Sequence, residues 1–211
     1  MQDLVILGAG GHGKVTADLA RACGFQPRAF VDIARVGEVA EPGGTKIDMD
    51  QVAFMAAVLR GETPFGPNAT VAIGNNAARL NLFFELKRHM NLPTLVHPTA
   101  WVSSSAEIGL GTHICPMVVI HPASWVGQAT ILNTRCIVEH DCVVGDGVHI
   151  SPGAVLCGGV HVGDGAWVGA GAVVIPGIRI GENAIVGAGA VVIRDVPAGA
   201  KMVGNPARIL G

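Results

Sequence analysis

The sequence predicts two kinds of structure in one chain, a small α/β domain followed by a parallel β-helix of hexapeptide repeats. Every sixth residue from Val96 to Val192 is Val, Ile or Leu, with no insertion and no exception. The residues four places further on, from Ala100 to Val196, are all small or aliphatic. A fixed period of six is typical of a parallel β-helix, and neither a helical period nor strict alternation reproduces it. Ahead of the repeats, a glycine-rich turn at residues 8–14 separates a strand pattern from a helix pattern, as in a βαβ unit.

The first domain, residues 1–93, is predicted to have a Rossmann-like α/β fold. Short apolar runs alternate with amphipathic segments, and the turns EPGG and TPFGPN divide them. Pro93 closes this domain. The expected strands are residues 2–7, 28–31 and 69–73, and the expected helices are residues 15–23, 50–60 and 77–90.

The second domain, residues 94–211, is predicted to wind three hexapeptides into each eighteen-residue coil of a triangular prism. Residues eighteen apart then stack, so Val138 and Leu156 belong to one internal ladder. Each buried aliphatic side chain contributes roughly 1.5–3 kcal/mol. We expect the chain to leave the prism at Pro197 and to end in a tail.

Composition excludes several classes of protein. Half of the 211 residues are hydrophobic and 14% are charged, which indicates a sizeable core rather than disorder. The net charge of -2 gives no basic field for nucleic acid or an anionic membrane. No run reaches the ~18 continuous apolar residues of a membrane span, and no basic leader opens the chain. Five cysteines without a CxxC pair indicate a reduced, cytoplasmic protein in which they are small buried or half-buried residues.

Three features of the first domain indicate a nucleotide site. Gly10 and Gly11 precede a helix whose N-terminus could face phosphate. Asp32 follows the second strand, where such folds contact a ribose or base, and Asn75 follows the third strand. Asn75 could equally be a helix cap. We interpret the GxGGxG turn as weaker than the spaced GxGxxG fingerprint. A purely structural turn is the alternative, and the half-size domain argues against a complete NAD site.

The chain has eight histidines that are candidates for a general base, a group that takes a proton during catalysis. A neutral imidazole suits this role because its pKa is near the working pH. His140 is the third residue of its hexapeptide, on a coil edge, with Glu139 before it and Asp141 after it. A neighbouring carboxylate can fix the imidazole tautomer and stabilise the imidazolium. His149 comes nine residues later, half a coil around the triangle, so within one prism it and His140 should point apart. They meet at one site only if an adjacent subunit supplies one of them.

The other histidines have less specific surroundings. His97 is expected at the domain junction, His113 and His161 at solvated prism positions, and His89 on a helix surface.

Four motifs in order, GAGGHGK, IGNN, IVEHD and VGNPAR, resemble those of the bacterial sugar acetyltransferases of the left-handed β-helix class. The subgroup that is most similar N-acetylates nucleotide-linked amino sugars of the UDP-bacillosamine and GDP-perosamine types, or O-acetylates sialic acid. The resemblance covers nearly the whole chain. It implies a left-handed winding, a homotrimer with active sites between subunits, acetyl-CoA in a groove between two prisms, and direct transfer to the 4-amino group of the sugar.

The resemblance also implies roles for residues of the second domain. His140 would be the general base, and Asp141, where relatives often carry Glu, would orient it. His149 would lie near the acetyl carbonyl of the cofactor. The backbone N–H groups of Cys157 and Gly158 are further candidates for binding the oxyanion. The tail would contact the cofactor through Gly204, Asn205 and Pro206, while Lys201 and Arg208 could meet its phosphates.

In the first domain, the resemblance places His12 by the sugar nucleotide, near the reacting centre; a polar residue at a helix start is the alternative. Relatives often have two adjacent acids after the second strand. Here Asp32 is followed by Ile33, which leaves the nucleobase open between uracil, guanine and thymine.

Three other functions are compatible with parts of the pattern. O-acetylation of sialic acid or a related sugar would use the same site. A zinc hydrase of the gamma carbonic anhydrase type is raised by His121, which falls one coil below His140 and one column over. No third histidine completes a tetrahedral set there, so no metal is expected. A non-catalytic trimer that binds nucleotide sugars is the third alternative.

Overall fold

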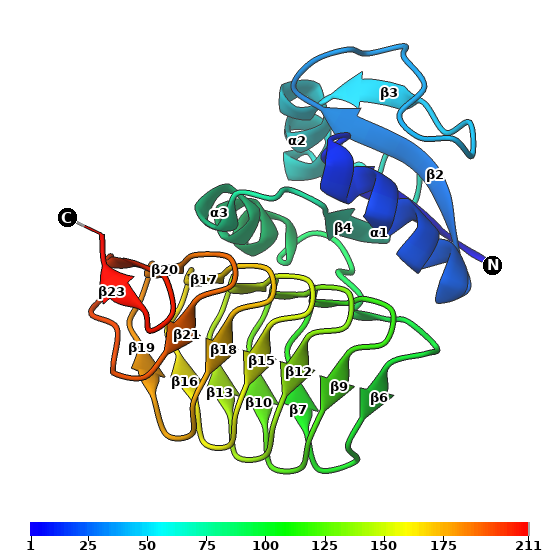
Figure 1. The fold of residues 1–211 in the computed structure, drawn as a ribbon. Coiled ribbons are helices and arrows are strands. Elements are labelled where there is room, and N and C mark those ends of the chain that lie inside the picture. The colour runs from blue at the N-terminus through cyan, green and yellow to red at the C-terminus, as the bar shows by residue number, and fades with distance from the viewer. Residues whose placement is uncertain (211) are drawn as a thin grey trace. The chain divides into compact units, whose positions relative to one another are not determined.

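The computed structural model describes residues 1–210, which divide into two compact units, Met1–Leu95 and a second unit that begins at Val96 (Figure 1). Each unit has its own sheets and its own buried core. Within the described range, no helix has the length and apolar character needed to cross a membrane.

The first unit is built on a four-stranded parallel sheet in the order β3-β2-β1-β4. Its core is formed by apolar residues of the strands, among them Leu7 and Phe30, and by Phe54 of a helix. The strand at Ile47–Asp50 was not predicted. Only Ile47 among its four residues is buried, so no apolar run marks the strand in the sequence. The elements are β1 (Gln2–Leu7), α1 (Gly11–Ala22), β2 (Phe25–Asp32), β3 (Ile47–Asp50), α2 (Gln51–Leu59), β4 (Ala69–Val71) and α3 (Asn76–Leu86).

Side-chain caps explain where two of the helices begin. The Asp50 carboxylate accepts hydrogen bonds from the N–H groups of Val52 and Ala53, and Asn75 Oδ1 accepts one from Ala78 N–H. Each such cap is worth about 1 kcal/mol. Helix α1 begins inside the glycine turn, four residues earlier than predicted, because the extended backbone of Gly10 serves as its N-cap.

The second unit consists of short strands, nearly all of two residues, that stack into three almost wholly parallel sheets, the arrangement typical of a left-handed parallel β-helix (Figure 1). From His113–Ile114 to Val191–Val192 the second residue of each strand is buried, and the predicted ladder through Val138 and Leu156 is buried from Ile120 to Val192. The first sheet contains β6 (Trp101–Val102), β9 (Val119–Ile120), β12 (Ile137–Val138), β15 (Val155–Leu156), β18 (Val173–Val174) and β21 (Val191–Val192). The second contains β7 (Glu107–Ile108), β10 (Trp125–Val126), β13 (Val143–Val144), β16 (His161–Val162) and β19 (Arg179–Ile180). The third contains β5 (Leu95–Val96), β8 (His113–Ile114), β11 (Ile131–Leu132), β14 (His149–Ile150), β17 (Trp167–Val168), β20 (Ile185–Val186), β22 (Lys201–Val203) and β23 (Arg208–Ile209).

The corners of the prism also repeat every six residues. From Gly111 to Gly189, each sixth residue has a positive φ between 49° and 76°. Glycine adopts this left-handed conformation without steric cost, which accounts for much of the glycine content of the repeats. Asp141, with φ 58°, is one of the non-glycine residues at these corner positions.

The prediction that the chain leaves the prism at Pro197 is wrong. Lys201 pairs in parallel with Ile185, sixteen residues earlier, whereas Ile185 pairs with Trp167, eighteen residues earlier. The last coil is therefore two residues shorter than the others. This shortening breaks the period of six. The periodic pattern therefore does not include Met202, although its side chain is buried.

Candidate active site

The first unit contains a cavity of about 330 Å³ at the carboxyl ends of its parallel strands. Open α/β sheets bind their ligands at this edge. The predicted residues Gly10, Gly11, His12 and Asp32 all line the cavity, whereas Asn75 does not. Asn75 instead caps α3. The complete lining is Gly8, Gly10, Gly11, His12, Asp32, Ile33, Gln51, Ala72, Ile73 and Gly74.

The glycines of the turn have different local surroundings. A Cβ on Gly8 would lie 2.7 Å from Ala72 O, and the φ of Gly8 is 108°. A Cβ on Gly13 would clash with Gly8 O, so Gly13 lets α1 approach the strand. Nothing lies within 4 Å of a Cβ on Gly10 or Gly11, which border the cavity. A tight turn, an open approach and close helix packing are the three roles of the GxGxxG fingerprint. Gly8, Gly10 and Gly13 supply that spacing, so the interpretation of the turn as a weaker pattern is wrong.

Asp32 holds the glycine turn in place. Its Oδ2 accepts a hydrogen bond of 2.5 Å from Ala9 N–H, and its Oδ1 accepts one from Ala34 N–H at 3.3 Å. Arg35 Nη2 donates to the carbonyl of Ala9 at 3.1 Å from the other side. The carboxylate thus lines the cavity and also fixes the backbone around it.

A buried arginine, which the sequence did not single out, supports another part of the cavity lining. Arg79 is 1% exposed and donates to Ile73 O at 2.9 Å, Gly74 O at 3.4 Å and Asn76 Oδ1 at 2.9 Å. Burial lowers the pKa of Arg79 to about 10. Ile73 and Gly74 belong to the lining, so the guanidinium fixes the loop that follows β4.

In the second unit, His140 and Asp141 form a pair at the corner after β12. His140 Nδ1 lies 2.6 Å from Asp141 Oδ2, and both side chains are more than 60% exposed. With Nδ1–H donating to the carboxylate, Nε2 carries the lone pair of a general base. Gly158 lies beneath the imidazole, because a Cβ there would come within 2.6 Å of His140 Nε2. The pair has the geometry needed to take a proton from an external group.

His149 lies on a different face of the prism, in β14. Its Nε2 is 3.1 Å from Asn133 Nδ2, and its ring stacks on Trp167 at 6.0 Å between centroids and 4° between planes. His140 follows the first sheet and His149 belongs to the third, so they do not converge within one prism.

Comparison with known proteins identifies the family. A model of the PglD N-terminal domain matches residues 3–86, and a model of the bacterial transferase hexapeptide (six repeats) matches residues 159–194. The GDP-perosamine N-acetyltransferase of Escherichia coli O157:H7 is 34% identical over 156 residues, which are 71% of this chain and 67% of that protein. The chain belongs to the hexapeptide-repeat acetyltransferases with a PglD-type N-terminal domain.

Solved structures agree over the whole length of this acetyltransferase. PerB from Caulobacter crescentus, in complex with CoA and GDP-perosamine, is 39% identical with a TM-score of 0.88, covering 100% of this chain and 98% of that one. The acetyltransferase domain of PglB from Neisseria gonorrhoeae FA1090, in complex with acetyl coenzyme A, is 36% identical with a TM-score of 0.90, covering 99% of each. The Caulobacter enzyme has also been solved as histidine mutants.

Two expectations for the acetyltransferase need correction. His113 is 1% exposed and not solvated, and its neighbour Ile131 on the next strand is buried as well. Register shows that a side chain points out of the prism, but not whether solvent lies beyond it. The N–H of Cys157 donates to Val174 O at 3.0 Å within the sheet, so it is not an oxyanion donor. Gly158 N–H is the candidate that stands.

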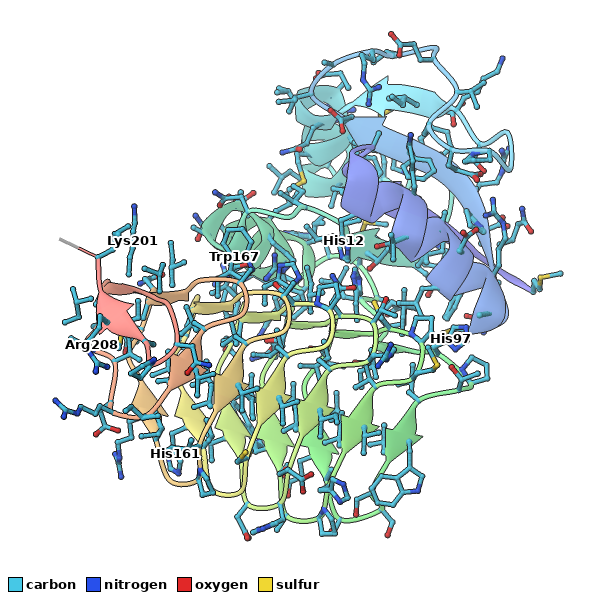
Figure 2. The ribbon with its side chains drawn as sticks, viewed as in Figure 1. His12, His97, His161, Trp167, Lys201 and Arg208 are labelled. Atoms are coloured by element: carbon cyan, nitrogen blue, oxygen red, sulfur yellow. The ribbon has the colours of Figure 1, made fainter. Side chains whose placement is uncertain are left out.

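In the described part of the chain, the remaining candidates form no hydrogen bond or ion pair with the side chains of His140 and Asp141. His121 Nε2 is 3.8 Å from Glu139 Oε2, and across residues 1–210 no group of three His, Cys, Asp or Glu side chains could hold a metal ion. Burial raises the pKa of the inward thiol of Cys142 to about 11, which makes it a poor nucleophile. Lys201 and Arg208 project from the C-terminal segment, and His161 from β16 (Figure 2).

The predicted tail residues are ordered against β21. Gly204 O accepts a hydrogen bond from Val191 N–H at 3.0 Å, and Ala207 N–H donates to Val191 O at 2.8 Å. The peptide bond between Asn205 and Pro206 is cis. The two hydrogen bonds to Val191 place the segment beside the last coil.

Proposed function

We propose that this chain transfers the acetyl group of acetyl-CoA to the 4-amino group of a nucleotide-linked amino sugar. The observation that carries the proposal is the His140–Asp141 pair on a prism corner, in a chain that matches acetyltransferases over its full length. Relatives whose structures hold CoA with GDP-perosamine support the substrate class. The nucleobase stays open between uracil, guanine and thymine.

The cavity of the first unit is proposed to hold the nucleotide part of the substrate. The N-terminus of α1 points backbone N–H groups and a positive partial charge at this edge, which suits a diphosphate. Gly10 and Gly11 leave open space where a side chain would stand. His12 and Asp32 line the same cavity and are the proposed polar contacts.

The reaction proceeds by direct transfer. The amine nitrogen attacks the thioester carbon of acetyl-CoA, and His140 Nε2 takes the proton that the nitrogen loses. Asp141 stabilises the resulting imidazolium. Gly158 N–H and His149 are the proposed donors to the oxygen that becomes negative in the tetrahedral intermediate. Collapse of the intermediate breaks the C–S bond, and the departing thiolate takes the proton back from His140, giving amide and free CoA.

A homotrimer with sites between subunits is proposed as the active form. His140 and His149 lie on different faces of one prism, so one site can hold both only if two copies contribute. A closed cyclic assembly provides three such sites. Acetyl-CoA would run along the groove between two prisms, past Gly204, Asn205 and Pro206, with Lys201 and Arg208 near its phosphates.

The test is CoA thiol release measured with UDP-, GDP- and dTDP-linked 4-amino sugars, each beside its 4-hydroxy counterpart and beside sialic acid. We expect release with one or more amino sugars only. In the His140→Asn variant, kcat should fall by about 10²–10⁴, the usual contribution of a general base. The His161→Asn variant is the matched control and should keep full activity. Release only with hydroxyl acceptors would replace N-acetylation by O-acetylation, and an unchanged kcat in His140→Asn would reject the assigned base.

A further inference from the structure

The imidazole of His149 is held by side chains from the coil before it and the coil after it. Asn133 follows β11, one coil earlier, and places its Nδ2 3.1 Å from His149 Nε2. Trp167 of β17 is the register partner of His149 one coil later, and the two rings are parallel within 4°. Neither neighbour was predicted as a site residue, because only the eighteen-residue register brings them together.

The orientation of the Asn133 amide is fixed independently. Its Oδ1 accepts a hydrogen bond from Thr134 N–H at 2.8 Å. The NH2 group must therefore point at His149, since a flipped amide would set an NH2 against the backbone N–H of Thr134. Because Asn133 Nδ2 can only donate, His149 Nε2 is the acceptor. In the neutral ring the proton then sits on Nδ1.

The plane of the ring is fixed from the other side. Trp167 Nε1–H donates to Ser151 Oγ at 2.7 Å, and Ser151 is 4% exposed. This part-buried hydrogen bond holds the indole, and the indole supports the imidazole at 6.0 Å between centroids. An imidazole turned out of this plane would lose the stacking, and one flipped within the plane would lose the Asn133 hydrogen bond.

We propose that Asn133 and Trp167 are positioning residues that hold His149 neutral, in one plane and in the Nδ1–H tautomer, so that its Nδ1–H donates to the acetyl carbonyl oxygen of acetyl-CoA. The inference rests on the proposed function, in which His149 meets that oxygen. A donor that is already oriented stabilises the developing oxyanion without reorganisation during the reaction. A proton on Nε2 would face the NH2 of Asn133, so this environment disfavours both the other tautomer and the imidazolium.

The first test needs no substrate. In protein labelled with ¹⁵N-histidine, the His149 signals, assigned by comparison with a His149→Gln variant, should show a protonated Nδ1 and a bare Nε2. In Asn133→Asp the carboxylate accepts, so Nε2 should become protonated. A wild-type ring with protonated Nε2, or a tautomer unchanged in Asn133→Asp, would overturn the proposal. This measurement decides the inference even if the protein acetylates none of the sugars tried.

The second test uses the proposed reaction. Asn133→Asp should lower kcat by about 10²–10³, as expected for the loss of one oxyanion donor, with KM for the nucleotide sugar unchanged. Trp167→Phe, which keeps a stacking ring, should retain more activity than Trp167→Ala. Trp125→Ala is the matched control on another sheet and should match the wild type. If the variants changed only the melting temperature, or if both Trp167 variants lost the same amount of activity, these residues would have a structural role and no role in positioning His149.

Discussion

At the scale of single residues, Asp141 combines a backbone conformation that favours glycine with a carboxylate on His140. Left-handed backbone costs an ordinary residue about 1–2 kcal/mol, and less for Asp. Asp141→Gly should therefore leave the melting temperature unchanged or raise it, while kcat falls because Nδ1 of His140 loses its partner. Thermal melting and steady-state kinetics on the same preparation test this.

The matched control for that substitution is Asn183→Gly, which has nearly the same backbone, φ 55°, without a catalytic neighbour. It should share the stability effect and keep full activity. If Asp141→Gly retained the wild-type kcat, the carboxylate would have no part in orienting His140.

Glu41 gives the first unit a defined acid sensitivity. Burial alone would raise the pKa of Glu41, but hydrogen bonds from Arg21 and from the N–H groups of Gly43 and Thr45 outweigh it and lower the pKa to about 2. A folded-state pKa below the unfolded value adds stability at neutral pH that is lost as the pH falls toward 2. The urea midpoint of the wild type should therefore drop between pH 4.5 and pH 2.

Glu41→Gln is the control for this acid sensitivity. It should be less stable than the wild type at pH 7 and should converge with it near pH 2. Parallel curves for the two proteins over this range would contradict the assignment.

At the scale of elements, the glycines at the start of α1 have two different roles. Gly13 is needed for packing, whereas Gly11 borders the cavity proposed to hold the nucleotide. Gly13→Ala should destabilise the protein, because its Cβ would meet Gly8 O. Gly11→Ala places its Cβ in open space and should fold normally. Its KM for the nucleotide sugar should rise, with KM for acetyl-CoA unchanged, because the methyl group enters the cavity. Equal melting temperatures for the two variants, or an unchanged KM in Gly11→Ala, would argue against this division.

Most elements could be predicted because their cause is local. The period of six located the strands of the second unit up to Val192, and the fold class followed from it. Strand β3 was not predicted because its sequence, IDMD, buries only one side chain. The last coil was not predicted because it is two residues shorter than the others, which shifts the period of six.

The candidate site follows the same rule. His140 and Asp141 are adjacent in sequence, so their contact was predictable. Trp167 comes eighteen residues after His149, so the register already placed the two on neighbouring strands, but it did not give the orientation of their rings. Arg79 contacts carbonyl groups only five and six residues earlier, and no pattern in the sequence marked this arginine as buried.

At the scale of the whole molecule, a site shared between subunits predicts complementation. The variants His140→Asn and His149→Gln should each be nearly inactive alone. When they are unfolded, mixed in equal amounts and refolded together, about one site in four of a cyclic trimer receives an intact His140 from one copy and an intact His149 from the next. Activity should therefore return to about a quarter of the wild-type value in the mixture. No recovery in assembled mixed trimers would place both histidines of a site in one copy.

The short last coil has a consequence for solubility. Val196 pairs with β19, Lys201–Val203 with β20, and the segment around Gly204 and Ala207 hydrogen-bonds to Val191 of β21. The last parallel strand of each of the three sheets is therefore already paired along its outer edge. In the third sheet, β23 pairs antiparallel with β22. An open solenoid end is a template on which another prism could stack, and repetition of that contact would produce a fibre. Because residues 195–209 cover this end, we expect them to oppose polymerisation of a repetitive, strand-rich chain through it.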